Sequence, residues 1–549
     1  MIRLAMEGHS AGEPRVRAPA AETPEKYLLR ALLLVLIGYG LSAAFHGPQW
    51  GTEQMIRAQA PPAAPGAAAA SKGAQSKLAA ASGKHLAALA VTRHPPYWMA
   101  VPFVMLLAAI AVLPLASVTA HWWESNLHRF YVAGGLAATT LLYYLGCHRY
   151  PLHAHWPAPH IAFAAEHGLN WSQTGQVLAD ALLNEYVPFI VLLFSLYVIS
   201  GGIRIAGDLP AHPRTNSLFL LLGGMLASIV GTTGAAMILI RPLLETNAER
   251  KHVEHTVVFF IFVVCNCGGC LLPTGDPPLF LGYLMGVDFF WTLRLFPQWL
   301  FVNGVLVTVY FALDYFWYYP RESLADVVRE EMRVHPLRIR GLWPNGLLLL
   351  ATIVCVAMLD PSKVLPGTDW HPWLYLREAV QLGLVALSLA WGDGHLRRAN
   401  RFDYGPIIEV AVLFFGIFIC MQPPLQVLAV EGPRLGLTAP WHYFWASGCL
   451  SSVLDNAPTY VVFFETAKAF SQGAALSPAV AGVGARLLAA LSLGSVFMGA
   501  NTYLGNGPNF MVKSMAEKSG VPMPSFLGYM LYAAVFLAPL WVLTTWLFF

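Results

Sequence analysis

The stretch TGDPP at positions 274–278 interrupts an apolar run that extends from 254 to 286. Glycine and proline stop a helix, and an aspartate inside an apolar run is costly in lipid. Irregular backbone at membrane depth is tolerated only where protein buries it or water reaches it. This stretch therefore predicts a broken helix whose free backbone groups and carboxylate line a binding site.

The composition indicates that lipid is the solvent for most of the chain. Of the 549 residues, 56% are hydrophobic and 11% are charged, whereas a soluble protein has about 25% charged residues. A net charge of +3 is too small to suggest a nucleic-acid partner. We therefore expect an all-α polytopic protein whose partner is the lipid bilayer.

Eight apolar stretches are long enough and continuous enough to predict membrane spans. They lie at 98–118, 130–147, 185–203, 299–319, 343–359, 374–392, 405–422 and 524–548. Four other apolar regions contain polar, glycine and proline residues that predict breaks. They are 216–246 (break at 231–234), 254–286 (273–278), 440–470 (455–458) and 484–517 (501–509).

Basic residues predict the orientation of these segments. The connector 320–342 carries five arginines, which places it in the cytoplasm by the positive-inside rule. Basic residues flank 216–246 on both sides, so this segment is predicted to be a re-entrant hairpin from the cytoplasmic face. The segment 440–470 has few basic neighbours and is predicted to be a hairpin from the opposite face. The prediction is eleven spans plus two hairpins, with the N-terminus inside.

The predicted elements fall into two units, 98–319 and 343–549. Each has five spans and one re-entrant hairpin, and the two units start on opposite sides of the membrane. This order predicts an inverted-topology repeat, which is a common plan of transporters. Local sequence agrees, because 274–280 aligns with 504–510.

The N-terminal region is outside this repeat. Residues 1–27 are predicted to be a polar tail, and 28–45 an additional membrane anchor, although a signal-like segment is an alternative. Residues 46–97 are rich in alanine and proline and are predicted to be a disordered linker.

The breaks supply the candidate binding residues. Asp276 and Asp455 lie in breaks of opposite units, and two carboxylates suit sodium and the protons that compete for the same oxygens. The neutral oxygens and amides at the breaks complete the set. The candidate substrate- or ion-binding residues are Thr232, Thr233, Asn266, Thr274, Asp276, Asp455, Asn456, Thr459, Asn501, Thr502, Asn506 and Asn509. Glu185 and Glu409, in matched third spans, are candidates for a coupling role.

Each of these residue types also has a structural interpretation. An aspartate at a break can cap a helix N-terminus. The cysteines at 265, 267 and 270 could be soft metal ligands, but tight helix packing explains them better. Five histidines between 148 and 167 lie in a predicted external loop at 148–184, where a solvated loop is favoured over a zinc site or a pH sensor.

The four breaks resemble those of the ion transporter superfamily, which includes NhaD-type sodium/proton antiporters, citrate and dicarboxylate transporters and arsenite pumps. The residues that carry the resemblance are 230–237, 268–278, 454–459 and 499–509. The resemblance covers roughly 98–548 and is nearest to NhaD-like proteins that also carry the label of citrate transporters. It implies a homodimer with a moving transport domain and elevator-type alternating access. The hairpin tips, Gly-Thr-Thr and Asp-Asn-Ala, depart from the Ser-Asn-Thr of dicarboxylate carriers.

We therefore expect a secondary transporter and not an enzyme, in a bacterial inner membrane. The aspartates favour sodium or lithium/proton antiport, with no cofactor other than the coupling ions. The alternative is proton- or cation-coupled transport of citrate or another small carboxylate. A membrane enzyme or sensor is disfavoured, because the sequence has no nucleophile–base pair, nucleotide-binding loop or attached catalytic domain.

Overall fold

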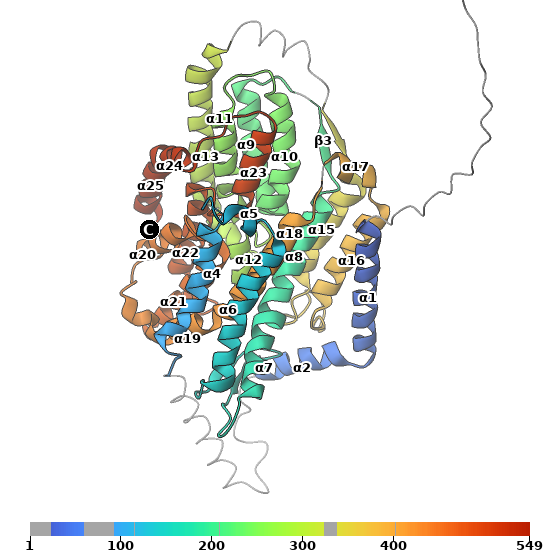
Figure 1. Ribbon diagram of the computed structural model, residues 1–549, viewed down its shortest axis with the longest axis vertical. Helices are drawn as coiled ribbons and strands as arrows, with labels where there is room; N and C mark the ends of the chain where they lie inside the picture. The colour runs from blue at the N-terminus through green and yellow to red at the C-terminus, as the bar shows by residue number, and fades with distance from the viewer. Residues whose placement is uncertain (1–23, 60–92, 115, 208, 323–336, 401) are drawn as a thin grey trace, which may run out of the picture.

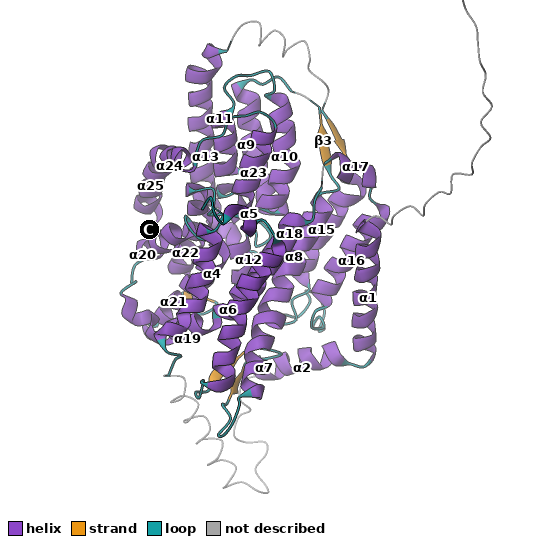
Figure 2. Ribbon diagram, viewed as in Figure 1, coloured by secondary structure: helices purple, strands orange, loops and turns teal. Residues whose placement is uncertain are grey.

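The computed structural model is mainly helical (Figures 1 and 2). It describes residues 24–59, 93–114, 116–207, 209–322, 337–400 and 402–549. The strands in these residues form three antiparallel two-stranded ribbons. They pair β1 (Leu152–Ala154) with β2 (His160–Ala162), β3 (Arg204–Ala206) with β4 (Arg338–Arg340), and β5 (Ala479–Val480) with β6 (Val483–Gly484).

The helices of the first half follow the apolar stretches of the sequence. In chain order they are α1 (Pro24–Ala44), α2 (Gly47–Gln59), η1 (Tyr97–Ala100), α4 (Val101–Val112), α5 (Ala120–Trp123), α6 (Asn126–Gly146), α7 (Trp171–Ala179), η2 (Asp180–Tyr186), α8 (Val187–Ser200), α9 (Pro213–Val230), α10 (Thr232–Thr246), α11 (Glu254–Val263), η3 (Cys267–Cys270), α12 (Pro277–Leu284), η4 (Trp291–Leu295), α13 (Phe296–Leu313), η5 (Asp314–Tyr318) and η6 (Tyr319–Arg321).

The second half repeats this alternation of long and interrupted helices. Its helices are α15 (Leu342–Met358), α16 (Leu376–Trp391), α17 (Gly394–Ala399), α18 (Gly405–Cys420), α19 (Gln422–Glu431), η7 (Gly432–Leu435), α20 (Pro440–Ser451), α21 (Asn456–Gly473), α22 (Ala485–Phe497), η8 (Met498–Asn501), α23 (Gly507–Lys518), α24 (Phe526–Tyr532), η9 (Ala533–Leu537) and α25 (Ala538–Phe548). Many helices of both halves have proline at the first or second position, as in α9, α12 and α23, where its missing N–H costs nothing.

Several helices have the length and composition of membrane spans. Four helical stretches qualify in the described residues: Pro24–Ala44, Trp171–Ser200, Trp291–Arg321 and Phe526–Phe548. The bent pair Gly405–Cys420 and Gln422–Leu435, with an angle of 44°, adds a fifth if it is one span. Shorter apolar helices accompany them. The chain is thus a polytopic membrane protein, while the predicted count of eleven spans stays a prediction.

Two segments differ from the sequence-based expectation. Residues 47–59 of the predicted disordered linker form α2, because the Thr52 hydroxyl bonds to the carbonyl of Pro372 and accepts from the amide of Leu374. The predicted external loop at 148–184 is also shorter, since helix begins at Trp171. Parts of three predicted segments lie outside the described residues: 1–23 of the tail, 60–92 of the linker and 323–336 of the connector.

Helices from the two halves of the chain pack crosswise. The pair α9–α10 lies in the upper half of Figure 1, and the pair α20–α21 lies in the lower half. Helix α23, from the end of the chain, packs on α10, whereas α12 packs on α21. Each half therefore contributes one helix that packs against the helix pair of the other half: α23 against the pair α9–α10, and α12 against the pair α20–α21. The buried core follows α9–α12 and α20–α23.

Candidate functional site

Four helix breaks fall where the sequence places them. Gly231 separates α9 from α10 with φ +87°, a backbone conformation that favours glycine. The other breaks lie between η3 and α12, between α20 and α21, and between η8 and α23. The first turns of α10, α12, α21 and α23 meet at one point inside the protein, as the contacts of Asp276 demonstrate.

Asp276 is the centre of this junction and is 1% exposed. Its Oδ1 accepts hydrogen bonds from Thr232 Oγ1 at 3.0 Å and from Asn506 Nδ2 at 3.1 Å. Its Oδ2 accepts one from Asn456 Nδ2 at 2.6 Å. Thr232 and Asn456 are the first residues of α10 and α21, and Asn506 precedes α23. One carboxylate therefore joins the N-terminal ends of four helices.

Two side-chain oxygens near this carboxylate are buried without a hydrogen-bond donor among the described residues. They are the Oδ1 atoms of Asn456 and Asn266. Asn266 uses its Nδ2 to bond Asn509 Oδ1 at 2.8 Å and the Ile261 carbonyl at 2.8 Å. A buried polar atom without a partner requires an explanation. Amide and carboxylate oxygens are hard ligands that suit a small cation.

The helix ends shape the electrostatics of the junction. A helix N-terminus carries roughly half a positive charge, so four of them supply about +2 in total. Asp276 and Asp455, when ionised, supply a similar negative charge. The junction is consequently close to neutral when both aspartates are ionised. It becomes positive when a cation or proton binds.

The second predicted aspartate has a different position. Asp455 Oδ1 accepts a hydrogen bond of 3.0 Å from the backbone N–H of Ala457, which makes Asp455 the N-cap of α21. Asp276, by contrast, precedes α12 but makes no side-chain cap bond to the described part of this helix. The capping interpretation therefore describes Asp455 and not Asp276.

Most of the remaining candidates bond to backbone at the breaks. Thr274 Oγ1 donates to the Ile229 carbonyl, and Thr459 Oγ1 donates to the Asp455 carbonyl. Thr502 Oγ1 donates to the Ser452 carbonyl. Asn501 lies between the Ser452 hydroxyl and the Trp541 indole. These residues hold the shape of the breaks, and Thr233 lies half-buried in the first turn of α10.

Asn509 connects the break between η8 and α23 with the break before α12 in the first half. Its Nδ2 donates to the carbonyls of Gly499 and Thr502, and its Oδ1 accepts from Asn266. The candidates that the structure brings together around Asp276 are thus Thr232, Asn456 and Asn506, with the Asn266–Asn509 pair beside them.

The two glutamates have partners in other helices. Glu409 in α18 forms an ion pair of 3.1 Å with Arg129 in α6. Glu185 lies in η2, and its Oε2 accepts from Gln422 Nε2 at 3.3 Å. These partners lie outside the Asp276 junction, so any coupling role for the two glutamates would be indirect.

Some residues that shape the junction were not singled out from the sequence. Trp299 Nε1 donates to the Gly268 carbonyl, and Asn303 Nδ2 donates to the Cys267 carbonyl. In the second half, the Tyr529 hydroxyl donates to the Ala500 carbonyl. Trp299 follows Asp276 by 23 residues, and Tyr529 follows Asn506 by the same 23 residues. This equal spacing in the sequence could have identified them.

The alternative metal sites gain no support. The cysteines 265, 267 and 270 are buried, and no group of three or more metal-ligating side chains occurs in the part of the chain that the structure describes. His148 is buried beside Tyr143, whose hydroxyl lies 3.3 Å from His148 Nδ1. His153, His155, His160 and His167 are exposed. Burial lowers the pKa of His148 to about 4.

The fold and the junction define a class: a polytopic membrane protein that encloses a buried polar site between broken helices. Residues 92–549 match the model of the family described as "Putative citrate transport", and the chain belongs to this family. The family and the apolar helices indicate a membrane transport protein. A search of curated proteins finds no match.

Proposed function

We propose that this protein is a secondary transporter of a small carboxylate of the citrate class, coupled to a cation or proton that binds Asp276. The observation that carries the proposal is the Asp276 carboxylate, which accepts hydrogen bonds from residues at the ends of α10, α21 and α23. An ionisable group enclosed by broken helices is well placed to bind a coupling ion. The family match supports the choice of carboxylate.

The charge of the junction supports a binding order in which the cation or proton binds first and the carboxylate second. Four helix N-termini roughly balance two ionised aspartates. A bound sodium ion or proton removes one negative charge and leaves an excess of positive charge. An anionic carboxylate then meets donors at the helix ends, which are natural anion sites. The anion is disfavoured while both aspartates are charged and the cation is absent.

We further propose that the two halves form an inverted-topology repeat with elevator-type movement. Support comes from Asp276 and Asn506, which are 230 residues apart and precede equivalent helices. The position of the helix pairs α9–α10 and α20–α21 in opposite halves of the long axis is also expected of such a repeat (Figure 1). A homodimer and a bacterial inner membrane, with the N-terminus in the cytoplasm, complete this proposal. The arginine-rich connector supports the orientation.

Sodium or lithium/proton antiport is a second candidate. The unpartnered oxygens of Asn266 and Asn456, among the described residues, favour it, because they suit a cation and give an anion nothing to bind. In this scheme the cation and the proton compete for Asp276, and no organic substrate crosses.

Reconstituted protein in liposomes with a trapped pH dye distinguishes the two candidates. We expect labelled citrate to accumulate when a sodium or proton gradient is imposed, and Asp276→Asn to abolish this uptake. Asp288→Asn is the matched control, because Asp288 is an exposed carboxylate paired with Lys363 at 3.0 Å. If sodium or lithium alone moves protons and citrate is not taken up, the protein is an antiporter. If neither solute moves, both candidates are wrong.

A further inference from the structure

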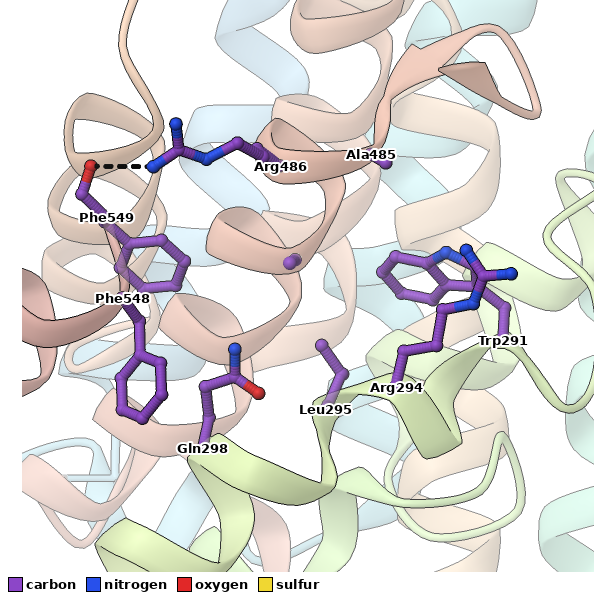
Figure 3. A pocket seen from close by; sticks show the side chains of 9 residues that line it. Trp291, Arg294, Leu295, Gln298, Ala485, Arg486, Phe548 and Phe549 are labelled. Carbon is purple, nitrogen blue, oxygen red and sulfur yellow. Dashed lines mark hydrogen bonds between the residues drawn. The ribbon is translucent and has the colours of Figure 1, made fainter. Parts of the chain in front are cut away.

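A cavity of about 180 Å³ lies away from the Asp276 junction, at the ends of three apolar helical stretches (Figure 3). Its walls come from the beginning of the Trp291–Arg321 stretch, the beginning of α22 and the end of α25. The lining residues are Trp291, Arg294, Leu295, Gln298, Ala485, Arg486, Ala489, Phe548 and Phe549. The ends of membrane-spanning helices lie at the level of lipid headgroups.

Two arginines line this cavity on opposite sides and come from different elements. Figure 3 shows Arg294 on the same side as Trp291, and Arg486 near Phe549 on the other side. Arg486 donates one bond of 3.4 Å to the main-chain oxygen of Phe549, which leaves other N–H groups of its guanidinium for a second acceptor. Arginine is suited to phosphate because its planar group can donate two parallel hydrogen bonds.

Buried polar atoms at the cavity lack partners in the described part of the chain. They are the indole Nε1 of Trp291 and the Oε1 of Gln298. Trp291 is 7% exposed, so its N–H cannot be satisfied by bulk water. The indole N–H lies on the same side of the cavity as Arg294 and is a further donor that an anion could use. The Gln298 oxygen would accept from a hydroxyl.

Exposed apolar side chains continue from the cavity along the outside of the protein. Leu293, Phe296 and Leu300 are 47%, 48% and 51% exposed, and Trp546 is 81% exposed. The acidic residue nearest to Arg294 in the sequence is Asp288, which is already paired with Lys363. The surface thus combines a cationic pocket with an apolar strip, and this combination is complementary to the headgroup and acyl chains of an anionic phospholipid.

We propose that this cavity binds the headgroup of an anionic phospholipid, with Arg294 and the Trp291 indole as phosphate donors on one wall and Arg486 as a second positive charge on the opposite wall. The acyl chains lie along the exposed face of the Trp291–Arg321 stretch. Basic side chains between membrane helices can hold a lipid headgroup, and here they lie at the end of the Trp291–Arg321 stretch opposite the predicted cytoplasmic connector. The lipid connects the helix after α12 with the helix before η8, so it bridges the two halves of the chain.

Native mass spectrometry of the full-length protein in detergent with added phosphatidylglycerol tests this site. We expect the wild type to retain a phosphatidylglycerol that Arg294→Gln/Arg486→Gln loses, with an apparent affinity at least about tenfold lower. Arg434→Gln is the matched control, because Arg434 is exposed and paired with Glu431 at 2.8 Å. This variant should retain the lipid.

Further arms of the experiment identify the source of the phosphate. Phosphatidylcholine should be retained less than phosphatidylglycerol, and inorganic phosphate should not displace the lipid. If the double variant does not fold, Trp291→Phe removes only the indole donor and should weaken retention. Equal retention by wild type and the arginine or tryptophan variants would overturn the proposal. Binding of inorganic phosphate without any arginine-dependent retention of lipid would also overturn it, and would assign the cavity to a free anion.

Discussion

The breaks before α12 and α23 share a backbone plan and differ in one charged residue. In the first, Gly275 and Asp276 precede α12; in the second, Gly505 and Asn506 precede α23. A Cβ atom on Gly275 would overlap the Gly269 carbonyl, and one on Gly505 would overlap the Gly499 carbonyl. The close backbone approach is therefore the same in both segments, while the carboxylate is present in one. The architecture is common to both halves, and the chemistry is concentrated in the first.

Replacement of the carboxylate should have the largest effect. Asp276→Asn keeps the shape of the side chain but removes the charge that Thr232, Asn456 and Asn506 surround. Loss of a buried, hydrogen-bonded charge costs about 2–5 kcal/mol, so we expect coupled uptake to fall by a factor of roughly thirty or more. Uptake by reconstituted protein measures this, with Asp288→Asn as control. Wild-type uptake by Asp276→Asn would remove this carboxylate from the mechanism.

Glycine substitutions test whether the backbone plan is equally tight in both segments. Gly275→Ala and Gly505→Ala should each lower the free energy of unfolding by about 1–3 kcal/mol, because the added methyl group meets backbone that cannot rotate away. Unfolding in mixed micelles provides the measurement. Gly304→Ala is the control, because a Cβ atom added at Gly304 would meet nothing within 4 Å among the described residues. If Gly275→Ala lowers the free energy of unfolding and Gly505→Ala leaves it unchanged, the two segments are not equivalent.

The aromatic side chains that donate hydrogen bonds to the two breaks allow a comparison of smaller stability effects. Trp299→Phe and Tyr529→Phe each remove one hydrogen bond to a carbonyl of η3 or η8. We expect each to cost about 1 kcal/mol, and more if the carbonyl remains without a donor. Thermal unfolding midpoints in detergent measure both. A large difference between the two variants would show that one segment depends more on its aromatic support.

The smallest effect on stability should come from the second aspartate. Asp455 caps α21 through the Ala457 N–H, and asparagine caps a helix about as well. Asp455→Asn should therefore change the free energy of unfolding by only about 0.5 kcal/mol or less, whereas Asp455→Ala should cost about 1 kcal/mol. Loss of uptake in a folded Asp455→Asn protein would show that the Asp455 charge at the junction is needed for transport, in addition to its cap.

The sequence predicts the breaks well because glycine and proline act locally. The positions of Gly231 and of the residues before α12, α21 and α23 follow from composition alone. The sequence does not distinguish Asp276 from Asp455, because the difference lies in partners 180 and 230 residues away. It also misses α2, which depends on tertiary contacts with the chain near Pro372. Local rules therefore identify the breaks, and only tertiary structure identifies which carboxylate they enclose.

The crosswise packing has a consequence for the synthesis of the chain. Helix α10 rests on α23, and α12 rests on α21, so the helices of the first half gain these neighbours only after most of the protein has been made. Until then Asp276 is without Asn456 and Asn506. Contacts between residues far apart in sequence form slowly, and a half-made membrane protein exposes polar groups that its final structure covers. The junction is thus one of the last parts of the molecule to be completed, and a truncated chain would carry an uncovered carboxylate in its interior.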